Sequence, residues 1–232
     1  MDDHVINVRS VSKAFEARKV LNRIDLSVSG GESVYICGIN GAGKSTLLRI
    51  ISGILQPDSG SVSLCGYDTA KNPEKAKPQL GVISHKAMVY PDLTVAENLK
   101  FFANLYGVDA PGKRVDELLE DVGLTPFRYD QAAILSRGLL QRLSIARALV
   151  HKPAILLADE PFTGLDSDSC KHLAGIFVDF LAKDGTIIMT THDAAVGLKC
   201  CQRVVVLDNG CFCLDESTEK INANSFADDY IS

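Results

Sequence analysis

The stretch Gly38-Ile39-Asn40-Gly41-Ala42-Gly43-Lys44-Ser45-Thr46 decides how the rest of the chain is interpreted. It fits the pattern G-x-x-x-x-G-K-[ST], in which glycines let successive backbone N–H groups curl around a phosphate that a Cβ would obstruct. A short apolar run, residues 33–37, precedes it, and apolar side chains at helical spacing follow it as far as Gly53. We therefore predict a phosphate-binding loop between a buried strand and a helix.

The polar residues of this loop suit a magnesium–nucleotide complex. Lys44 places a positive charge against the β- and γ-phosphates, and the hydroxyl of Ser45 is a hard oxygen ligand for Mg²⁺. The helix that begins near Lys44 directs the positive end of its dipole at the same phosphates. We predict that a nucleoside triphosphate is bound by the following residues: Asn40, Gly41, Ala42, Gly43, Lys44, Ser45 and Thr46.

Composition limits the classes of partner. The 24 Lys and Arg against 29 Asp and Glu give a net charge of −5, which argues against nucleic acid as the main partner. The polar start, Met1 to His4, does not resemble a signal peptide, and no apolar run approaches the roughly 18 residues of a membrane span. We expect any membrane-spanning part to be supplied by another chain.

The seven cysteines are odd in number and lack C-x-x-C spacing, which is typical of reduced thiols. Cys211 and Cys213 form a C-x-C pair that fits either a metal site or alternate positions of a hydrophobic strand. We favour the strand.

Strand-like runs alternate with helical patterns along the chain, which predicts a parallel sheet with helices on both faces. Thr94 and Glu97 form a capping box for a helix that ends at Leu105. The helix-rich stretch at about 86–150 is expected to be an inserted subdomain within a single domain, residues 1–232. The predicted strands cover residues 5–8, 24–28, 33–37, 61–64, 154–158, 186–189 and 204–207, and the other predicted helices cover 115–122, 136–150 and 169–182, with an Asn209-Gly210 hairpin.

Three polar residues follow two of the predicted strands. Asp159 ends an apolar strand and can present a carboxylate to Mg²⁺, and Glu160 is placed to polarise the attacking water as a general base. His192 follows the next strand, and ligands gather at the carboxyl edge of such sheets. Alone, each pattern is also typical of a solvated strand end. Together with the phosphate loop they predict a hydrolytic site with Glu160, His192 and Lys44 as its catalytic residues and with Ser45 and Asp159 as metal ligands.

These motifs, in this order, resemble the ATP-binding subunits of ABC transporters over nearly the whole chain. Leu135-Ser136-Arg137-Gly138-Leu139 is similar to the family signature, and Gly164-Leu165-Asp166 resembles the D-loop. The resemblance places His192 as the switch histidine and Phe15 as the aromatic that stacks on adenine. It implies an α/β fold of the P-loop NTPase class, with a mixed sheet core, an N-terminal antiparallel β subdomain and an inserted helical subdomain.

The resemblance also implies a mechanism. Two subunits, here in a homodimer, sandwich two ATP molecules with Mg²⁺, and Ser136, Arg137 and Gly138 of one copy cap the γ-phosphate held by Lys44 of the other. Asp166 belongs to the same interface. Closure on ATP and reopening after hydrolysis drive an integral membrane permease, so the expected location is the cytoplasmic face of the cell membrane.

Three positions depart from the family pattern. His85 stands where a glutamine is expected, and imidazole is a poorer magnesium ligand than an amide oxygen, although a relay role could survive. Arg137 replaces the first glycine of the signature and Leu139 replaces its glutamine. Arg137 could pair with phosphate or lie on the surface, and we favour the surface. None of these changes removes Lys44 or Glu160, so an active ATPase is expected.

A narrower resemblance is to the ATPase subunit of the haem exporter used in cytochrome c biogenesis. Exporter ATPases for drugs or polysaccharides share parts of the pattern and remain alternatives. A soluble ABC ATPase that acts on the ribosome or on DNA is a third possibility, but only about 90 residues separate Thr46 from Ser136, with no long insertion. A nucleotide sensor without turnover is disfavoured by Glu160. The resemblance to the haem exporter rests on His85, Tyr90, Leu93, Thr94, Glu97, Asn98, Leu99, Leu105, Tyr106, Gly107, Val108 and residues 135–138.

Overall fold

The computed structural model describes residues 4–84 and 86–230. His85, one of the predicted nucleotide contacts, lies outside the described residues, as do the side chains of residues 224, 225, 228 and 229.

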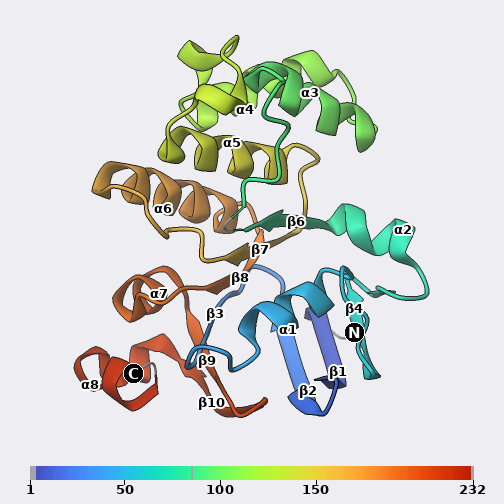
Figure 1. Ribbon diagram of the computed structural model, residues 1–232, viewed down its shortest axis with the longest axis vertical. Coiled ribbons are helices and arrows are strands. Elements are labelled where there is room, and N and C mark those ends of the chain that lie inside the picture. Colours follow the sequence, from blue (N-terminus) through green and yellow to red (C-terminus); the bar gives the residue numbers. More distant parts are fainter. Residues whose placement is uncertain (1–3, 85, 231–232) are drawn as a thin grey trace.

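Two sheets form the lower two thirds of the molecule in Figure 1. The first is antiparallel, has four strands in the described part of the chain, and runs in the order β2-β1-β4-β5. Its strands are β1 (His4–Phe15), β2 (Arg18–Ser29), β4 (Ser59–Leu64) and β5 (Tyr67–Asp68). β1 and β2 extend well beyond the predicted runs, because their polar residues pair along a bulged and irregular register that apolar patterning does not show.

The second sheet is mixed and has the order β10-β9-β3-β8-β7-β6 among the described residues. Its first five strands along the chain run parallel, and β10 pairs antiparallel with β9. The strands are β3 (Ser33–Cys37), β6 (Leu80–Ile83), β7 (Ile155–Asp159), β8 (Thr186–Thr190), β9 (Arg203–Asp208) and β10 (Cys211–Ser217). The parallel arrangement brings the carboxyl ends of β3, β7 and β8 to one edge.

Helices cover both faces of this sheet and extend above it in Figure 1. α1 packs in the hydrophobic cluster shared by the two sheets, whereas α6 and α7 pack on the other face. The helices are α1 (Lys44–Ile51), α2 (Pro73–Ala76), α3 (Val95–Leu105), α4 (Pro111–Asp121), α5 (Arg137–Leu149), α6 (Ser167–Leu181), α7 (Ala194–Cys200) and α8 (Ala223–Tyr230). Short 3₁₀ turns cover Lys77–Gln79, Thr125–Phe127, Ala132–Ile134 and Thr218–Lys220.

The stretch from α3 to α5 has a hydrophobic cluster of its own, which includes Leu99, Leu118 and Leu143. The predicted capping box is present, since the Thr94 side chain accepts from the Glu97 N–H and the Glu97 carboxylate accepts from the Thr94 N–H. Buried Asn98 bonds the backbone at Tyr90 with both ends of its amide, at 2.8 and 2.9 Å, and so fixes the segment that enters α3. The position of this stretch as an insertion remains a prediction.

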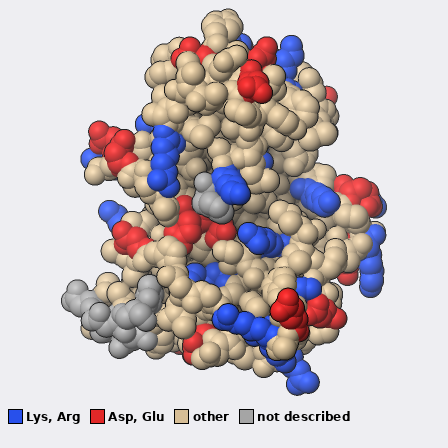
Figure 2. Space-filling view, viewed as in Figure 1, with Lys and Arg blue, Asp and Glu red and all other residues tan. Residues whose placement is uncertain are grey.

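The Asn209-Gly210 hairpin is confirmed, because both residues have positive φ, 46° and 75°, and join β9 to β10 as a two-residue turn. Cys211 and Cys213 lie in β10, and the described residues contain no group of His, Cys, Asp and Glu that could hold a metal. Charged side chains of both signs are interspersed over the face shown in Figure 2. No helix in the described ranges is long and apolar enough to span a membrane.

Candidate active site

The loop between β3 and α1 needs its glycines for two separate reasons. Gly38, Gly41 and Gly43 have φ values of 137°, 81° and 111°, which side chains with a Cβ rarely adopt. A Cβ on Gly38 would also overlap the carbonyl oxygen of Leu207 in β9. The backbone of the loop therefore passes directly against the end of β9.

Lys44 is the first residue of α1 and is almost fully buried. Its ammonium donates to the carbonyls of Gly38 (2.6 Å) and Ile39 (3.0 Å), so it lies inside the loop rather than in solvent. Burial lowers the pKa of Lys44, although Glu160 and Asp159 act in the opposite direction. The helix has no side-chain cap at Gly43, so a cation and free helix N–H groups share one position, which suits an anion.

Asp159 is the centre of a cluster of hard oxygen atoms. Its Oδ1 accepts from the hydroxyls of Ser45, at 3.3 Å, and Thr190, at 2.7 Å. Carboxylate and hydroxyl oxygens are ligands that Mg²⁺ prefers. The two predicted metal ligands are therefore brought together from β7 and α1, and the chemistry of this donor set fits the ion.

Glu160 is held from several sides. Its φ of 54° is unusual for a residue with a side chain, and its N–H donates to Thr190 O at 3.1 Å. Its Oε2 accepts from Thr163 Oγ1 at 3.0 Å and from the His192 N–H at 3.2 Å. The His192 Nε2 lies 3.1 Å from Oε1. The carboxylate is therefore fixed beside Asp159, and His192, which is half-exposed, contacts it directly.

The predicted signature residues occupy another helix end. Ser136 is the N-cap of α5, and its Oγ accepts from the Leu139 N–H at 3.4 Å. Asp166 caps α6 by accepting from the Ser169 N–H at 2.8 Å, a bond that lowers the pKa of Asp166. Among residues 4–84 and 86–230, no hydrogen bond or ion pair joins residues 136–138 to the phosphate loop.

Arg137 and Gly138 both lie against their own chain. The guanidinium of Arg137 occupies the place that a Cβ on Gly164 would take, and Ser169 Oγ lies 2.8 Å from where a Cβ on Gly138 would be. Arg137 is exposed, as a surface residue is expected to be, but its guanidinium also packs on Gly164. The prediction of a surface position therefore describes Arg137 only in part.

Phe15 ends β1 with its ring 46% exposed, and the Lys13 ammonium lies 5.6 Å from the ring centroid. An exposed ring beside a cation can stack on a flat base. The nucleotide contacts predicted at Phe15, Asn40, Gly41, Ala42, Gly43, Thr46 and Asp166 remain predictions.

Thr163 and Thr190 are the functional residues that the sequence did not reveal. Thr190 is the last residue of β8, and its hydroxyl orients Asp159; Thr163 orients Glu160. The available signal for Thr190 was a hydroxyl at the end of a buried apolar run, two residues before His192.

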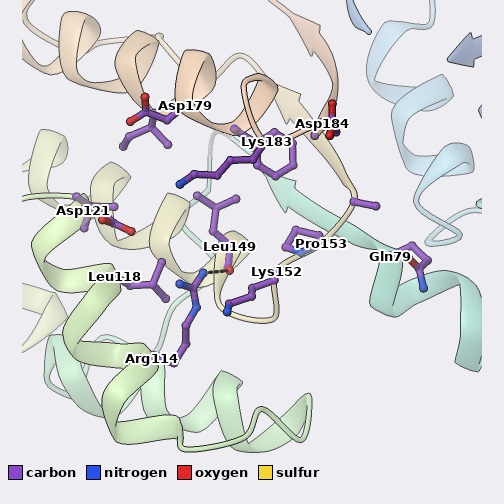
Figure 3. Close-up of a pocket in the computed structure, with 15 residues that line it drawn as sticks. Gln79, Arg114, Leu118, Asp121, Leu149, Lys152, Pro153, Asp179, Lys183 and Asp184 are labelled. Carbon is purple, nitrogen blue, oxygen red and sulfur yellow. Dashed lines mark hydrogen bonds between the residues drawn. The ribbon is translucent and has the colours of Figure 1, made fainter. Parts of the chain in front are cut away.

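A cavity of about 650 Å³, shown in Figure 3, lies at the opposite edge of the sheet. Pro153 and Gly185 in its wall precede β7 and β8, and Arg114 donates to the Leu149 carbonyl there at 2.8 Å. It contains none of the predicted site residues. A smaller hollow of about 370 Å³ includes Asp159 and runs past Ser84 to Met88.

Known proteins are similar to this chain in sequence. The family described as "ABC transporter" matches residues 21–163. The linearmycin resistance ATP-binding protein LnrL of Bacillus subtilis is 35% identical over 208 residues, which are 89% of this chain and 67% of that protein. The Nod factor export ATP-binding protein I of Burkholderia orbicola is 36% identical over 88% of this chain and 68% of that protein.

Solved structures confirm the predicted fold. One described as an ATP-binding subunit of an ABC transporter has a TM-score of 0.86 and 31% identity, covering 92% of this chain and 90% of its own. A dimeric ATP-binding cassette in a post-hydrolysis state, bound to ADP and phosphate, has a TM-score of 0.83 and 28% identity, covering 93% of this chain and 100% of its own. The chain therefore belongs to the ABC transporter family as an ATP-binding subunit with the fold and the ATP hydrolase activity of an ABC ATPase.

Proposed function

We propose that this chain hydrolyses Mg²⁺–ATP as half of a homodimer and drives a separate membrane permease that exports a substrate. The observation that carries the proposal is the fixed carboxylate of Glu160, which Thr163 and His192 hold beside Asp159. A general base must be oriented before it can take a proton from water, and these contacts orient it.

Each remaining residue has a binding role. Ser45 and Asp159 would hold Mg²⁺, which when bound would supply positive charge against the phosphates. Lys44 and the N–H groups at the start of α1 bind the same phosphates. Glu160 accepts a proton from the attacking water, and His192 keeps that carboxylate in place through its ring nitrogen and its backbone N–H.

The separation of the two helix ends supports the dimer. In the described ranges, Ser136 to Gly138 do not bond the phosphate loop of their own chain, while the start of α5 stays exposed. A second copy turned to face the first would bring its α5 onto the γ-phosphate. The dimeric relative with ADP and phosphate supports this arrangement.

The permease is proposed to insert a short helix into the hollow that runs from Asp159 to Met88. Met88 and Ile54, which line the hollow, are 50% and 66% exposed and so offer apolar surface to a partner. A structural relative, described as part of the ABC transporter complex cbiONQ, is 27% identical over 98% of this chain. The chain would then lie at the cytoplasmic face of the membrane without crossing it.

The substrate class is inferred from relatives named for linearmycin resistance and for Nod factor export, which favour an exporter. They lend no support to haem, so haem export rests only on the resemblance at residues 85–108 and 135–138. Action on the ribosome or on DNA is disfavoured by the net charge of −5 and by the mixed charges of the face in Figure 2.

Glu160→Gln tests the catalytic part of the proposal. We expect turnover to fall about a thousandfold, within the range for loss of a general base, while ATP with Mg²⁺ gives a stable dimer in light scattering. Glu120→Gln, on an exposed position of α4, is the matched control and should behave as wild type. A Glu160→Gln protein that remains monomeric at saturating ATP and Mg²⁺ contradicts the sandwich.

Ile54→Glu tests the partner. Wild-type protein should co-purify with a multispanning membrane protein, and Ile54→Glu should lose it while the ATPase rate of the isolated subunit is kept. Recovery of the native complex only on ribosomes or DNA would show that the transporter assignment is wrong.

A further inference from the structure

The first turns of α5 form a seam with the loop that follows β7. Gln141 Nε2 donates to the Pro161 carbonyl at 3.0 Å. One turn earlier, Gly138 lies so close to α6 that a Cβ there would sit 2.8 Å from Ser169 Oγ. The signature helix and the D-loop of one chain are therefore packed as a unit.

In this seam Arg137 lies against Gly164. Gly164 has a φ of 71°, and the guanidinium of Arg137 fills the space of its absent Cβ. Within the described part of the chain, no carboxylate pairs with Arg137, so packing on the peptide is what places this group. A Cβ at position 164 would displace the guanidinium from this place.

The loop braced in this way leads directly to Glu160. Thr163, next to Gly164, donates its hydroxyl to Glu160 Oε2 at 3.0 Å, and its N–H lies 3.3 Å from the Glu160 carbonyl. Glu160 itself has an unfavourable φ of 54°, which persists only if the surrounding loop maintains it. Thr163, the residue before Gly164, therefore connects this loop with the carboxylate of the proposed base.

We propose that Arg137 is a positioning residue, which braces the 161–166 loop of its own chain and so lets the signature helix set the orientation of Glu160. A glycine at this position, as in the usual family signature, offers no such contact. In this proposal Arg137 is neither a phosphate ligand nor a surface residue without a role. The inference rests on the proposed role of Glu160.

The test is a double-mutant cycle on the full chain with Arg137→Gly, Gly164→Ala and the double variant. Arg137→Gly should lower kcat about tenfold, equivalent to about 1.4 kcal/mol of barrier, with KM for ATP within about twofold. Gly164→Ala should lower kcat similarly, and the double variant should be no worse than either single one. Arg137→Lys, which lacks the flat group, should restore little.

Gly107→Ala is the matched control, because Gly107 has a φ of 65° and nothing within 4 Å of its Cβ position. It should share the backbone strain but keep wild-type kcat. The dimer is measured separately, with Arg137→Gly placed in the Glu160→Gln background, and it should still form with ATP.

The other outcomes overturn the inference. Unchanged kcat makes Arg137 a surface residue, and a raised KM with loss of the ATP-dependent dimer makes it a phosphate ligand. Additive losses in the cycle show that Arg137 and Gly164 act independently. If Glu160→Gln alone kept full turnover, the proposed role of Glu160 as the base would be wrong. If Glu160→Gln were inactive but the losses in the cycle were additive, only the proposed role of Arg137 would be wrong.

Discussion

The helices α1 and α5 are both predicted to bind a phosphate at their first turn, but their two N-terminal ends are capped differently. At α1 the N-cap is Gly43 with no side-chain bond, and the buried Lys44 occupies the first position. At α5 the cap is Ser136, whose hydroxyl accepts from Leu139 at 3.4 Å. The start of α1 therefore has no side-chain cap and has a buried lysine beside it, whereas the start of α5 is exposed and is capped by one long hydrogen bond.

This difference between the two helix ends indicates which part of the proposed ATP site a single chain supplies. Everything at the α1 end comes from one chain, through the carboxyl edge formed by β3, β7 and β8. The α5 end has a long capping bond that a better acceptor could replace at little cost. We expect changes at the start of α1 to abolish ATP binding, and changes at the Ser136 cap of α5 to affect steps that need both copies.

The largest expected effect is at Gly38. Gly38→Ala places a Cβ onto the Leu207 carbonyl, so we expect a loss of about 3 kcal/mol or more in unfolding free energy, together with loss of ATP binding. Urea unfolding and binding of a fluorescent ATP analogue measure the two. Gly66→Ala is the control, since its φ is 83° but nothing lies within 4 Å, and only about 1 kcal/mol should be lost. Equal effects in both variants would contradict the close approach.

The second largest effect is a pH dependence of stability at the C-terminal end of α5, which is hydrogen-bonded to β6. Arg147 donates to the Val82 carbonyl, and His151 Nε2 donates to the Leu80 carbonyl at 3.1 Å. Burial lowers the pKa of His151 to about 4, and the charges of Arg147 and Arg114 act in the same direction. The Nδ1 atom is buried without a partner, so a proton added there would have no acceptor.

The unfolded chain therefore binds a proton at His151 below about pH 6.5, while the folded chain does so only near pH 4. Stability falls as the pH drops through this window, by about 3 kcal/mol at most from this group. His151→Gln keeps a donor for Leu80 but cannot titrate, so its unfolding free energy should fall less between about pH 7 and about pH 4.5. His4→Gln is the control. Parallel pH profiles for wild type and His151→Gln would exclude the mechanism.

The sequence predicted local features best. The strand–loop–helix at residues 33–52 and the capping box at Thr94 depend on neighbours in the chain, and both are present. The extents of β1 and β2 were missed, because polar strand residues are stabilised by pairing with distant strands. Helix α7 was also missed, although Asp193 caps it by accepting from Val196 and directly follows His192.

Contacts across the fold were harder to predict. From the sequence, the expected neighbour of Arg137 was either phosphate or solvent, whereas in the structure it is Gly164. This contact depends on how α5 and α6 pack together on one face of the sheet. Thr163 and Thr190 were missed for the same reason. Each hydroxyl donates to a carboxylate whose position depends on the fold.

The smallest expected effect on stability comes from removing a helix cap, and it distinguishes a purely structural cap from one that also binds a nucleotide. Thr94→Ala and Ser136→Ala each remove a side-chain cap and should each cost about 1 kcal/mol in urea unfolding. Only Ser136 is proposed to meet the partner's nucleotide, so only Ser136→Ala should also lower turnover and weaken the ATP-dependent dimer in the Glu160→Gln background. Because stability changes equally in both variants, unfolding cannot account for such a difference. If the two variants had the same turnover and the same dimer, Ser136 would be a structural cap alone and the asymmetry between α1 and α5 would have no catalytic meaning.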